Sequence, residues 1–72
     1  MTRVLQTVEE AKSAVETYAG PAEGFKLAIA DELLDPAGMR MALINDAVLA
    51  KGFMPEGFEQ RDGYRIYSYA DL

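Results

Sequence analysis

Apolar residues recur with a helical period near the start of the chain, where the first element is predicted. They stand three or four residues apart, with charged and hydroxyl residues between them, at Val8, Ala11, Val15 and Tyr18. Thr7 and Glu10 have the spacing of a capping box, in which each side chain accepts a hydrogen bond from a backbone amide of the first turn. Gly20 and Pro21 then end the pattern. A helix is therefore predicted over residues 7–19.

Two more apolar patterns predict helices over residues 22–34 and 37–51. The first pattern ends before Asp35-Pro36, because a residue that precedes proline avoids helical backbone angles. Asp35 can then cap the next helix, with Pro36 in its first turn, and Gly52 ends that helix. The inward-facing residues of the two helices are Phe25, Ala28, Ile29 and Leu33, and then Met41, Ile44 and Val48, with Leu43 and Ala47 as further candidates. Residues 3–6 form either a short edge strand or an extended lead-in.

From Phe53 onward the helical period is lost. Residues 54–57, Met-Pro-Glu-Gly, are typical of a turn. Residues 58–69 have the pattern of a β-hairpin whose tip is Arg61-Asp62-Gly63. These elements predict an α+β fold of three short helices followed by a C-terminal antiparallel β-hairpin, with or without a short N-terminal strand. The whole chain, residues 1–72, is expected to form a single domain.

Two registers of the hairpin compete. A two-residue turn at Asp62-Gly63 would pair Phe58 with Tyr67, whereas a three-residue loop would pair Phe58 with Ile66. The three-residue loop is preferred, because it places apolar side chains on one face of the hairpin and an opposite-charge pair on the other. The apolar face then consists of Phe58, Tyr64 and Ile66.

The preferred register makes a prediction about function. It places Arg65, Tyr67 and Tyr69 on the sheet face away from the helices, where these side chains would be partly exposed. Tyrosine and arginine are enriched at the energetic centres of interfaces, so these three residues, with Arg61 at the tip, are the candidate partner-binding residues. The alternative is that Val4-Leu5 or the chain end covers this face, in which case the tyrosines belong to the core.

Composition limits the size of the core and the location of the protein. The chain has 72 residues, of which 50% are hydrophobic and 26% charged, as in a globular domain. A core this small contributes at most ~5 kcal/mol of net stability, so a partner or a homodimer is an expected source of further stability. No apolar run is long enough to span a membrane, and no signal sequence is visible. A cytoplasmic location is expected, and the absence of cysteine agrees with it.

Acidic residues outnumber basic ones, and most of the excess lies in the first half of the chain. The net charge is −5. Residues 1–36 contain three basic and seven acidic residues, a net charge of −4, whereas residues 37–72 contain four and five, a net charge of −1. An acidic surface repels phosphate and anionic lipid. A protein partner with a basic surface is therefore expected, rather than nucleic acid or a membrane.

The side chains that most often perform catalysis are missing. The chain has no histidine and no cysteine, so it lacks the commonest general base, the commonest metal ligand and a thiol nucleophile. Asp31 and Asp35, four residues apart, come closest to a site for Mg²⁺ or Ca²⁺, but a capping role for Asp35 and a solvated role for Asp31 are preferred. No catalytic residue, metal site or cofactor is predicted, and the chain is not expected to be an enzyme.

The order of elements in the second half of the chain resembles the end of a winged helix domain. Residues 49–53, Leu-Ala-Lys-Gly-Phe, are followed by a hairpin with a charged, glycine-containing tip, and the resemblance covers residues 25–69. It implies that helix 37–51 enters a DNA major groove and that the wing touches phosphate. The contacts implied are Arg40, Asn45 and Lys51 on the helix, and Arg61 and Arg65 on the wing. One copy offers few cations for this role, so the DNA-binding form would be a dimer.

The function expected from the sequence is a non-enzymatic macromolecule-binding module. We expect a small acidic regulator or inhibitor that contacts a protein through its acidic helices, through the face with Arg65, Tyr67 and Tyr69, or through both. In size and charge the chain is similar to small acidic inhibitors encoded by phages and mobile elements, including anti-CRISPR and DNA-mimic proteins. A winged-helix-like DNA-binding dimer is the alternative.

Overall fold

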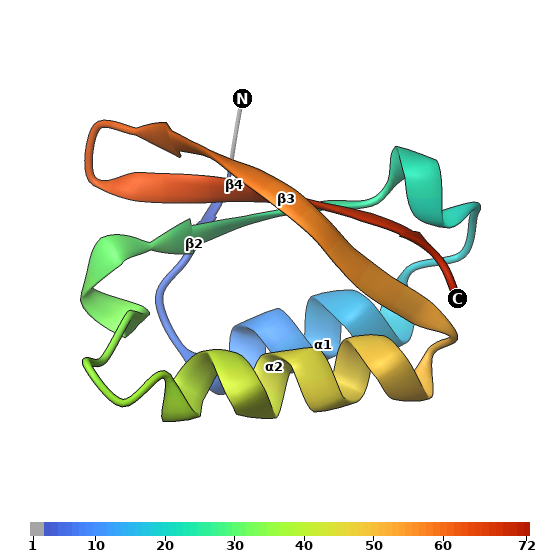
Figure 1. The fold of residues 1–72 in the computed structure, drawn as a ribbon, viewed down its shortest axis with the longest axis horizontal. Coiled ribbons are helices and arrows are strands. Elements are labelled where there is room, and N and C mark those ends of the chain that lie inside the picture. The colour runs from blue at the N-terminus through green and yellow to red at the C-terminus, as the bar shows by residue number, and fades with distance from the viewer. Residues whose placement is uncertain (1–2) are drawn as a thin grey trace.

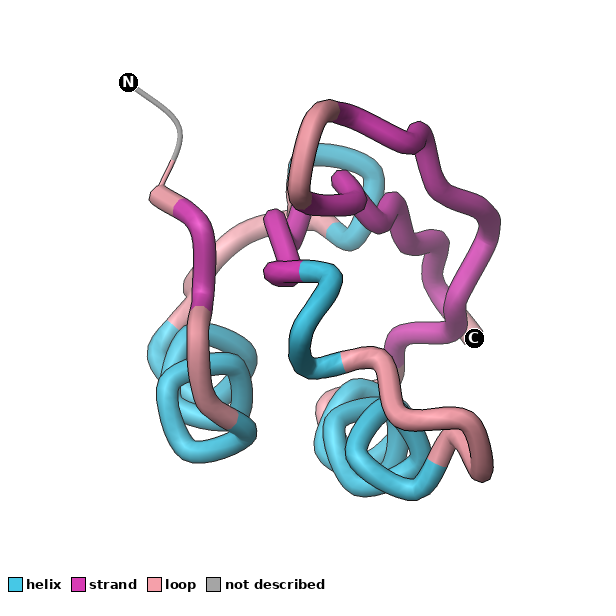
Figure 2. The backbone as a smooth tube through the Cα atoms, turned by 90° about the vertical axis from the view of Figure 1, so that its left-hand side faces the viewer, coloured by secondary structure: helices cyan, strands magenta, loops and turns pink. Residues whose placement is uncertain are grey.

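Two α-helices pack on one face of a four-stranded mixed sheet in the structure, a computed structural model that describes residues 3–72 (Figure 1). The strands are β1 (Val4–Leu5), β2 (Lys26–Ala30), β3 (Phe53–Arg61) and β4 (Tyr64–Asp71), in the order β1-β2-β4-β3. The helices are α1 (Val8–Thr17) and α2 (Met39–Ala50), and short 3-10 turns, η1 (Ala22–Gly24) and η2 (Asp31–Leu33), flank β2. A view along the helices shows both of them on the same side of the sheet (Figure 2). The α+β class is confirmed, with two α-helices in place of the three predicted.

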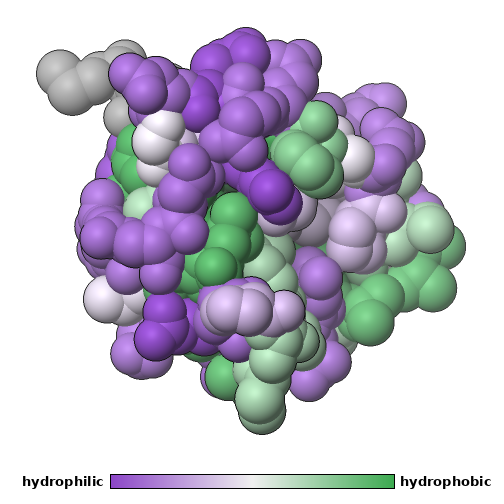
Figure 3. Space-filling model, turned by 60° about the vertical axis from the view of Figure 1, so that its left-hand side comes forward, coloured by the Kyte–Doolittle hydropathy of each residue, from purple (hydrophilic) through white to green (hydrophobic). Residues whose placement is uncertain are grey.

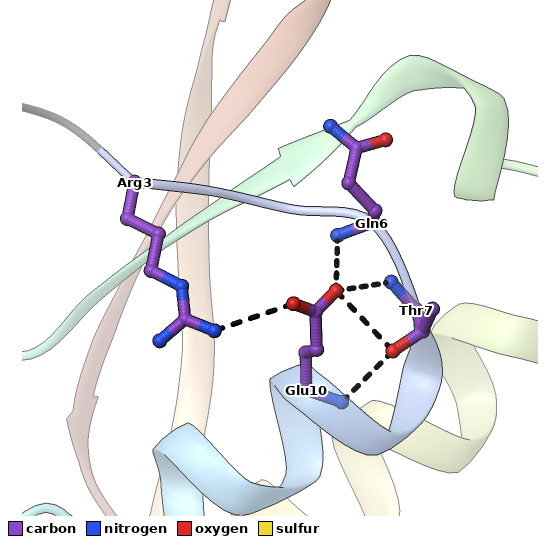
Figure 4. Close-up of polar contacts among 4 residues, drawn as sticks. All are labelled: Arg3, Gln6, Thr7 and Glu10. Atoms are coloured by element: carbon purple, nitrogen blue, oxygen red, sulfur yellow. Dashed lines mark hydrogen bonds and ion pairs between the residues drawn. The ribbon is translucent and has the colours of Figure 1, made fainter.

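α1 begins at the predicted capping box (Figure 4). The Thr7 hydroxyl accepts a hydrogen bond from the Glu10 amide at 3.1 Å, and the Glu10 carboxylate accepts from the amides of Thr7 at 3.1 Å and Gln6 at 2.9 Å. Arg3 adds an ion pair with Glu10 at 3.2 Å. The hydrogen bond from the Gln6 amide, above all, lowers the pKa of the Glu10 carboxyl below its usual value. Neighbouring residues alone therefore fix the start of this helix.

The helix predicted over residues 22–34 is wrong, because this segment forms β2 between the turns η1 and η2. β2 lies between two strands, parallel to β1 and antiparallel to β4, and the optional N-terminal strand is thereby confirmed. Leu27 and Ile29 are buried toward the helices, while Ala28 and Ala30 are buried on the opposite face. Alanine fits a helical and an alternating pattern equally well. Pairing with two neighbouring strands therefore decides the conformation here.

α2 begins after a turn that contains Asp35. The Asp35 carboxylate accepts hydrogen bonds from the amides of Met39 and Arg40, both at 3.1 Å, so it satisfies the first amides of the helix as predicted, although the N-cap position itself is Gly38. These bonds, with that from the Arg40 amide the largest, lower the pKa of the Asp35 carboxyl. The prediction that Pro36 lies in the first helical turn is wrong. Pro36 precedes the helix, and Gly38, with a φ of 71°, leads into it.

β3 and β4 form the predicted hairpin, but in the register that was not preferred. Asp62 and Gly63 make a two-residue turn, and Phe58 pairs with Tyr67. Gly63 has a φ of 86°, which glycine adopts without steric cost. A shift of one residue turns every side chain of a strand to the opposite face. The predicted faces are therefore reversed for the β4 residues, so Arg65, Tyr67 and Tyr69 lie on the helix side, whereas Phe58 stays on that side as predicted.

The turn predicted over residues 54–57 is also wrong, since these residues belong to β3. Pro55 pairs with Tyr69 and Gly57 pairs with Ser68, so Glu56 is the extra residue of a β-bulge. Proline is tolerated because β3 is an edge strand, whose outward amides need no partner strand. β3 therefore runs the full length of the sheet edge.

The core lies between the helix layer and the sheet. Its buried members come from every helix and strand: Leu5, Ala11, Val15, Ala22, Phe25, Leu27, Ile29, Leu33, Ile44, Val48, Phe53 and Tyr69. Aromatic rings fill the end near η1, where Phe25 lies 5.3 Å from Tyr69 and 5.7 Å from Phe53, between ring centroids. The predicted inward residues of both α-helices are confirmed at Val15, Ile44 and Val48, whereas Leu43, a further candidate, is wrong because its side chain is exposed.

Candidate protein-binding surface

α2 has an apolar side chain on most of its circumference, and only one side of it meets the rest of the protein. Ile44 and Val48 are fully buried toward the sheet and α1. On the opposite side, large apolar side chains are exposed: Met39 by 68%, Leu43 by 51% and Leu49 by 48%. We call the set Met39, Ala42, Leu43, Asp46, Leu49 and Ala50, all exposed, the outer face of α2. In water such a face costs free energy that a partner surface would recover.

Asp46 is the one charged residue of the outer face. Its helical neighbours, three and four residues away on either side, are Ala42, Leu43, Leu49 and Ala50. None of these neighbours is a cation, so the carboxylate of Asp46 is surrounded by apolar side chains of its own helix. The outer face is thus an apolar surface with a negative charge within it.

A groove of about 230 Å³ runs between α1 and α2 beside the outer face. It is lined by Val15, Glu16, Ala47, Ala50 and Lys51. Lys51 crosses the end of the groove, where its ammonium donates hydrogen bonds to the backbone carbonyls of Glu16 and Tyr18. The small alanine side chains leave room between the helices, and Glu16 adds an exposed carboxylate at the rim.

An aromatic group on the hairpin is the second candidate surface. The Phe58 and Tyr67 rings are 5.4 Å apart, and the guanidinium of Arg65 lies 4.3 Å from the centre of the Phe58 ring. Arg65 also donates hydrogen bonds to the Gln60 side chain and to the Tyr67 hydroxyl. The structure therefore brings Arg65 and Tyr67 together, as predicted, but with Phe58, which is 51% exposed, as the outermost ring.

The predicted position of Tyr67 and Tyr69, on the face away from the helices, is wrong. Leu27 of β2 pairs with Tyr67, and both side chains contribute to the core on the helix side. Tyr69 is only 2% exposed, and its burial raises the pKa of the phenol far above the usual value. The alternative, that the tyrosines belong to the core, is correct for Tyr69. Neither Val4-Leu5 nor the chain end covers it, since Tyr69 packs between the sheet and the helix layer.

Apolar and polar surface alternate on the side of the molecule that carries the hairpin tip and the start of α2 (Figure 3). Green apolar areas stand between purple polar ones, and no continuous apolar surface covers this view. The predicted tip residue Arg61 is exposed here and pairs with Glu59. An interface in this region would therefore use separate apolar anchors with polar contacts between them.

The three residues that the winged helix resemblance places on DNA have local contacts. Arg40 is exposed, with one guanidinium nitrogen donating to the Glu32 carbonyl at 3.1 Å. Asn45 is partly buried, and its side-chain oxygen makes no hydrogen bond with the described residues. Lys51 is bound to the end of α1, as above. Two of the three side chains are therefore held by local hydrogen bonds, and the third is partly withdrawn from the surface.

No acidic cluster for a metal is present within residues 3–72, where no three acidic side chains gather closely enough to hold an ion. Asp31 accepts hydrogen bonds from the Gln60 amide, at 3.1 and 3.2 Å, and Asp35 caps α2. Both carboxylates thus have structural partners. Neither helix of the described chain has the length and apolar character needed to cross a membrane.

The chain matches no family model, no curated protein and no solved structure in the three comparisons made.

The outer face of α2 was not among the predicted sites. One signal in the sequence could have revealed it: within Met39–Ala50 only Arg40, Asn45 and Asp46 are polar. A helix that is apolar on nearly every side needs a partner on nearly every side.

Proposed function

We propose that this chain is a non-enzymatic protein-binding module, a small acidic regulator or inhibitor that contacts its target through the outer face of α2. The observation that supports this most is the exposure of Met39, Leu43 and Leu49 on a helix whose other side already fills the core. Full burial of a large aliphatic side chain is worth ~1.5–3 kcal/mol, and a partner would recover the share that corresponds to the exposed half or more of each of these three. This gain offsets part of the cost of association.

The Arg65, Tyr67 and Phe58 group supports a second contact area for the same kind of partner. Tyrosine and arginine recur at interface hot spots. Arg65 already stacks on the Phe58 ring and donates to the Tyr67 hydroxyl, so its side chain loses little conformational entropy when a partner binds. A binding role for the hairpin, first predicted for Arg61, Arg65, Tyr67 and Tyr69, thus remains a proposal that relies on Arg65 and Phe58. Buried Tyr69 supports the hairpin from inside.

The absence of histidine and cysteine supports a binding role rather than catalysis. Binding of DNA by a winged-helix-like dimer stays the alternative prediction. It requires Arg40 and Lys51 to give up their hydrogen bonds to backbone carbonyls. A gel-shift titration with duplex DNA tests it, because tight binding that weakens steeply with salt would favour DNA over a protein target.

Photo-crosslinking from the helix surface tests the proposed function. A photoreactive phenylalanine analogue replaces Leu43 in one variant and Lys12, on the exposed side of α1, in the control. We expect irradiation in host lysate to give one discrete protein adduct from position 43 and none from position 12. The adduct partner, once purified, should bind the unmodified chain. Equal and diffuse labelling from both positions would mean that the outer face of α2 binds no specific protein.

A further inference from the structure

We propose that the occupant of the outer face of α2 is a basic amphipathic helix, with an apolar side chain in the groove between α1 and α2 and cations opposite Asp46 and Glu16. This inference rests on the proposed function and adds the chemistry of the partner. In helix-in-groove recognition an amphipathic helix lays its apolar face on an apolar surface. The outer face of α2 offers an apolar surface, and the small groove beside it offers room for one side chain.

The charge on the helix layer favours a cationic partner. Asp46 has only apolar neighbours on its own helix, so its carboxylate is free for an incoming cation. Exposed acids on α1, Glu9 and Glu16, add to this charge, with Lys12 as the one exposed base of that helix. Arg40 and Lys51, at the two ends of α2, keep their positive charges, but their hydrogen bonds to the carbonyls of Glu32 and Tyr18 hold them away from Asp46 at the centre of the outer face.

The surroundings of Asp46 make the expected ion pair stronger than an ordinary surface pair. A partner that covers Leu43 and Leu49 removes water from the carboxylate between them. Where water is excluded, the attraction between opposite charges is screened less than it is at an open surface. An apolar partner without a cation would instead leave the Asp46 carboxylate desolvated and unpaired, which is costly. The same residue therefore selects for basic partners and against purely apolar ones.

The groove supplies a place for one apolar anchor. Ala47 and Ala50 are small, and Val15 forms the floor, so about 230 Å³ is open to an aliphatic side chain. Glu16 stands on the rim of the same groove. An incoming helix can thus place an apolar residue in the groove and a lysine or arginine one turn away.

A second copy of the chain fits this surface less well. Each copy carries a net charge of −5, so two copies repel one another at low salt. Pairing of two outer faces would also bring an Asp46 carboxylate from each copy into one apolar interface. Like charges in such an interface are destabilising. A basic helix from another protein meets neither obstacle.

A designed peptide provides the test. The probe is a labelled helical peptide of about 18 residues, built from leucine on one face and lysine on the other, and its counterpart carries glutamate in place of lysine. Fluorescence anisotropy at physiological salt measures binding to the full chain. We expect the lysine peptide to bind and the glutamate peptide to bind at least about tenfold more weakly, a difference of ~1.4 kcal/mol.

Matched variants locate the site. Asp46→Lys should weaken binding of the lysine peptide by about tenfold or more. Glu56→Lys, with the same change of charge on the exposed bulge of β3, should weaken it by less than about threefold, the effect of long-range charge alone. Ala50→Phe, which fills the groove, should weaken binding, whereas Ala37→Phe in the turn before α2 should not. Circular dichroism confirms that each variant is folded.

Three outcomes would overturn the inference. The first is equal binding of both peptides, and the second is an equal effect of Asp46→Lys and Glu56→Lys on binding of the lysine peptide. The third is failure of the lysine peptide to bind, together with a concentration-dependent dimer in sedimentation that Asp46→Lys leaves intact. Failure here is distinguishable from failure of the proposed function. A specific adduct from position 43 together with no preference for lysine would mean a protein partner of different chemistry. No adduct and no peptide binding would remove both.

Discussion

The two helices lie side by side in one layer, yet they present opposite surfaces to the solvent. α1 buries Ala11 and Val15 and exposes glutamate, lysine, serine and threonine. α2 buries Ile44 and Val48 and exposes methionine, leucine and alanine around one carboxylate. Both helices contribute equally well-buried residues to the same core. The fold therefore explains the inner side of each helix and the outer side of α1, but it does not explain the outer side of α2.

This difference shows that core-facing residues and solvent-facing residues are selected for different properties. A residue that faces the core is selected for folding, and a solvent-facing residue of α1 is selected for solubility and helix formation. Exposed Leu43 and Leu49 favour the helix but reduce solubility, and polar helix formers would serve both purposes. Their presence is most simply explained by contact with another molecule, and each of the following measurements compares one helix side with another.

The largest effect is expected for the inner side of α2. Ile44→Ala should destabilise the fold by ~2–5 kcal/mol, because it removes a fully buried side chain and leaves a cavity. In a domain of this size such a loss is enough to unfold much of the population at 25 °C. Urea titration followed by circular dichroism measures it. A change below about 1 kcal/mol would mean that α2 does not anchor the core.

A smaller effect is expected at the start of α1. Thr7→Ala removes the hydroxyl that accepts from the Glu10 amide, and it should cost about 1 kcal/mol. Thr7→Ser, which keeps the hydroxyl, is the matched control and should retain most of the stability. Equal losses in both variants would show that the β-branched methyl group, and not the cap, stabilises this end. The urea midpoint, at unchanged slope, is the quantity to compare.

Acid should loosen the starts of both helices. The pKa values of Glu10 and Asp35 are lowered in the folded state, so their contribution to stability is fully present above the usual values, 4.5 and 3.8. It is lost as pH falls through the lowered folded values. The melting temperature should therefore decline below about pH 4.5. Glu10→Gln and Asp35→Asn should each reduce that decline, and an unchanged profile in both would assign the acid sensitivity to other carboxylates.

The smallest effect is expected on the outer face of α2. Replacement of Leu43 and Leu49 together by glutamine should change stability by less than ~0.5 kcal/mol per residue, because exposed positions contribute little to folding. The same double variant should lose binding of the lysine peptide and of the purified adduct partner. A large loss of stability would mean that these leucines fold the chain, and the contrast between the helices would then disappear.

Local signals in the sequence were sufficient for some elements of the fold. The Thr7 and Glu10 pair fixed the start of α1, and the Asp35 cap and Gly52 bracketed α2. The hairpin tip was found because Asp62-Gly63 favours a turn. In each case residues close in sequence determine the conformation, so no knowledge of the rest of the chain is required.

The predictions were wrong where contacts between segments distant in sequence determine the conformation. β2 contains alternating alanines that fit a helix equally well, and only its position between β1 and β4 makes it a strand. The hairpin register depends on Tyr67 lying beside Leu27 of β2, a contact across 40 residues of sequence that no local pattern contains. Because the register was wrong, Tyr69 was placed on the surface. The outer face of α2 was missed because an apolar helical pattern alone does not say which side meets the core.

The strand order has a consequence for the cooperativity of folding. β4, at residues 64–71, is not at the sheet edge but between β2 and β3, and it carries the buried Tyr69. Until β4 has paired, β2 and β3 have no shared neighbour and the aromatic end of the core is open. We therefore expect the sheet and the core to form in one cooperative step, with no stable state that lacks β4.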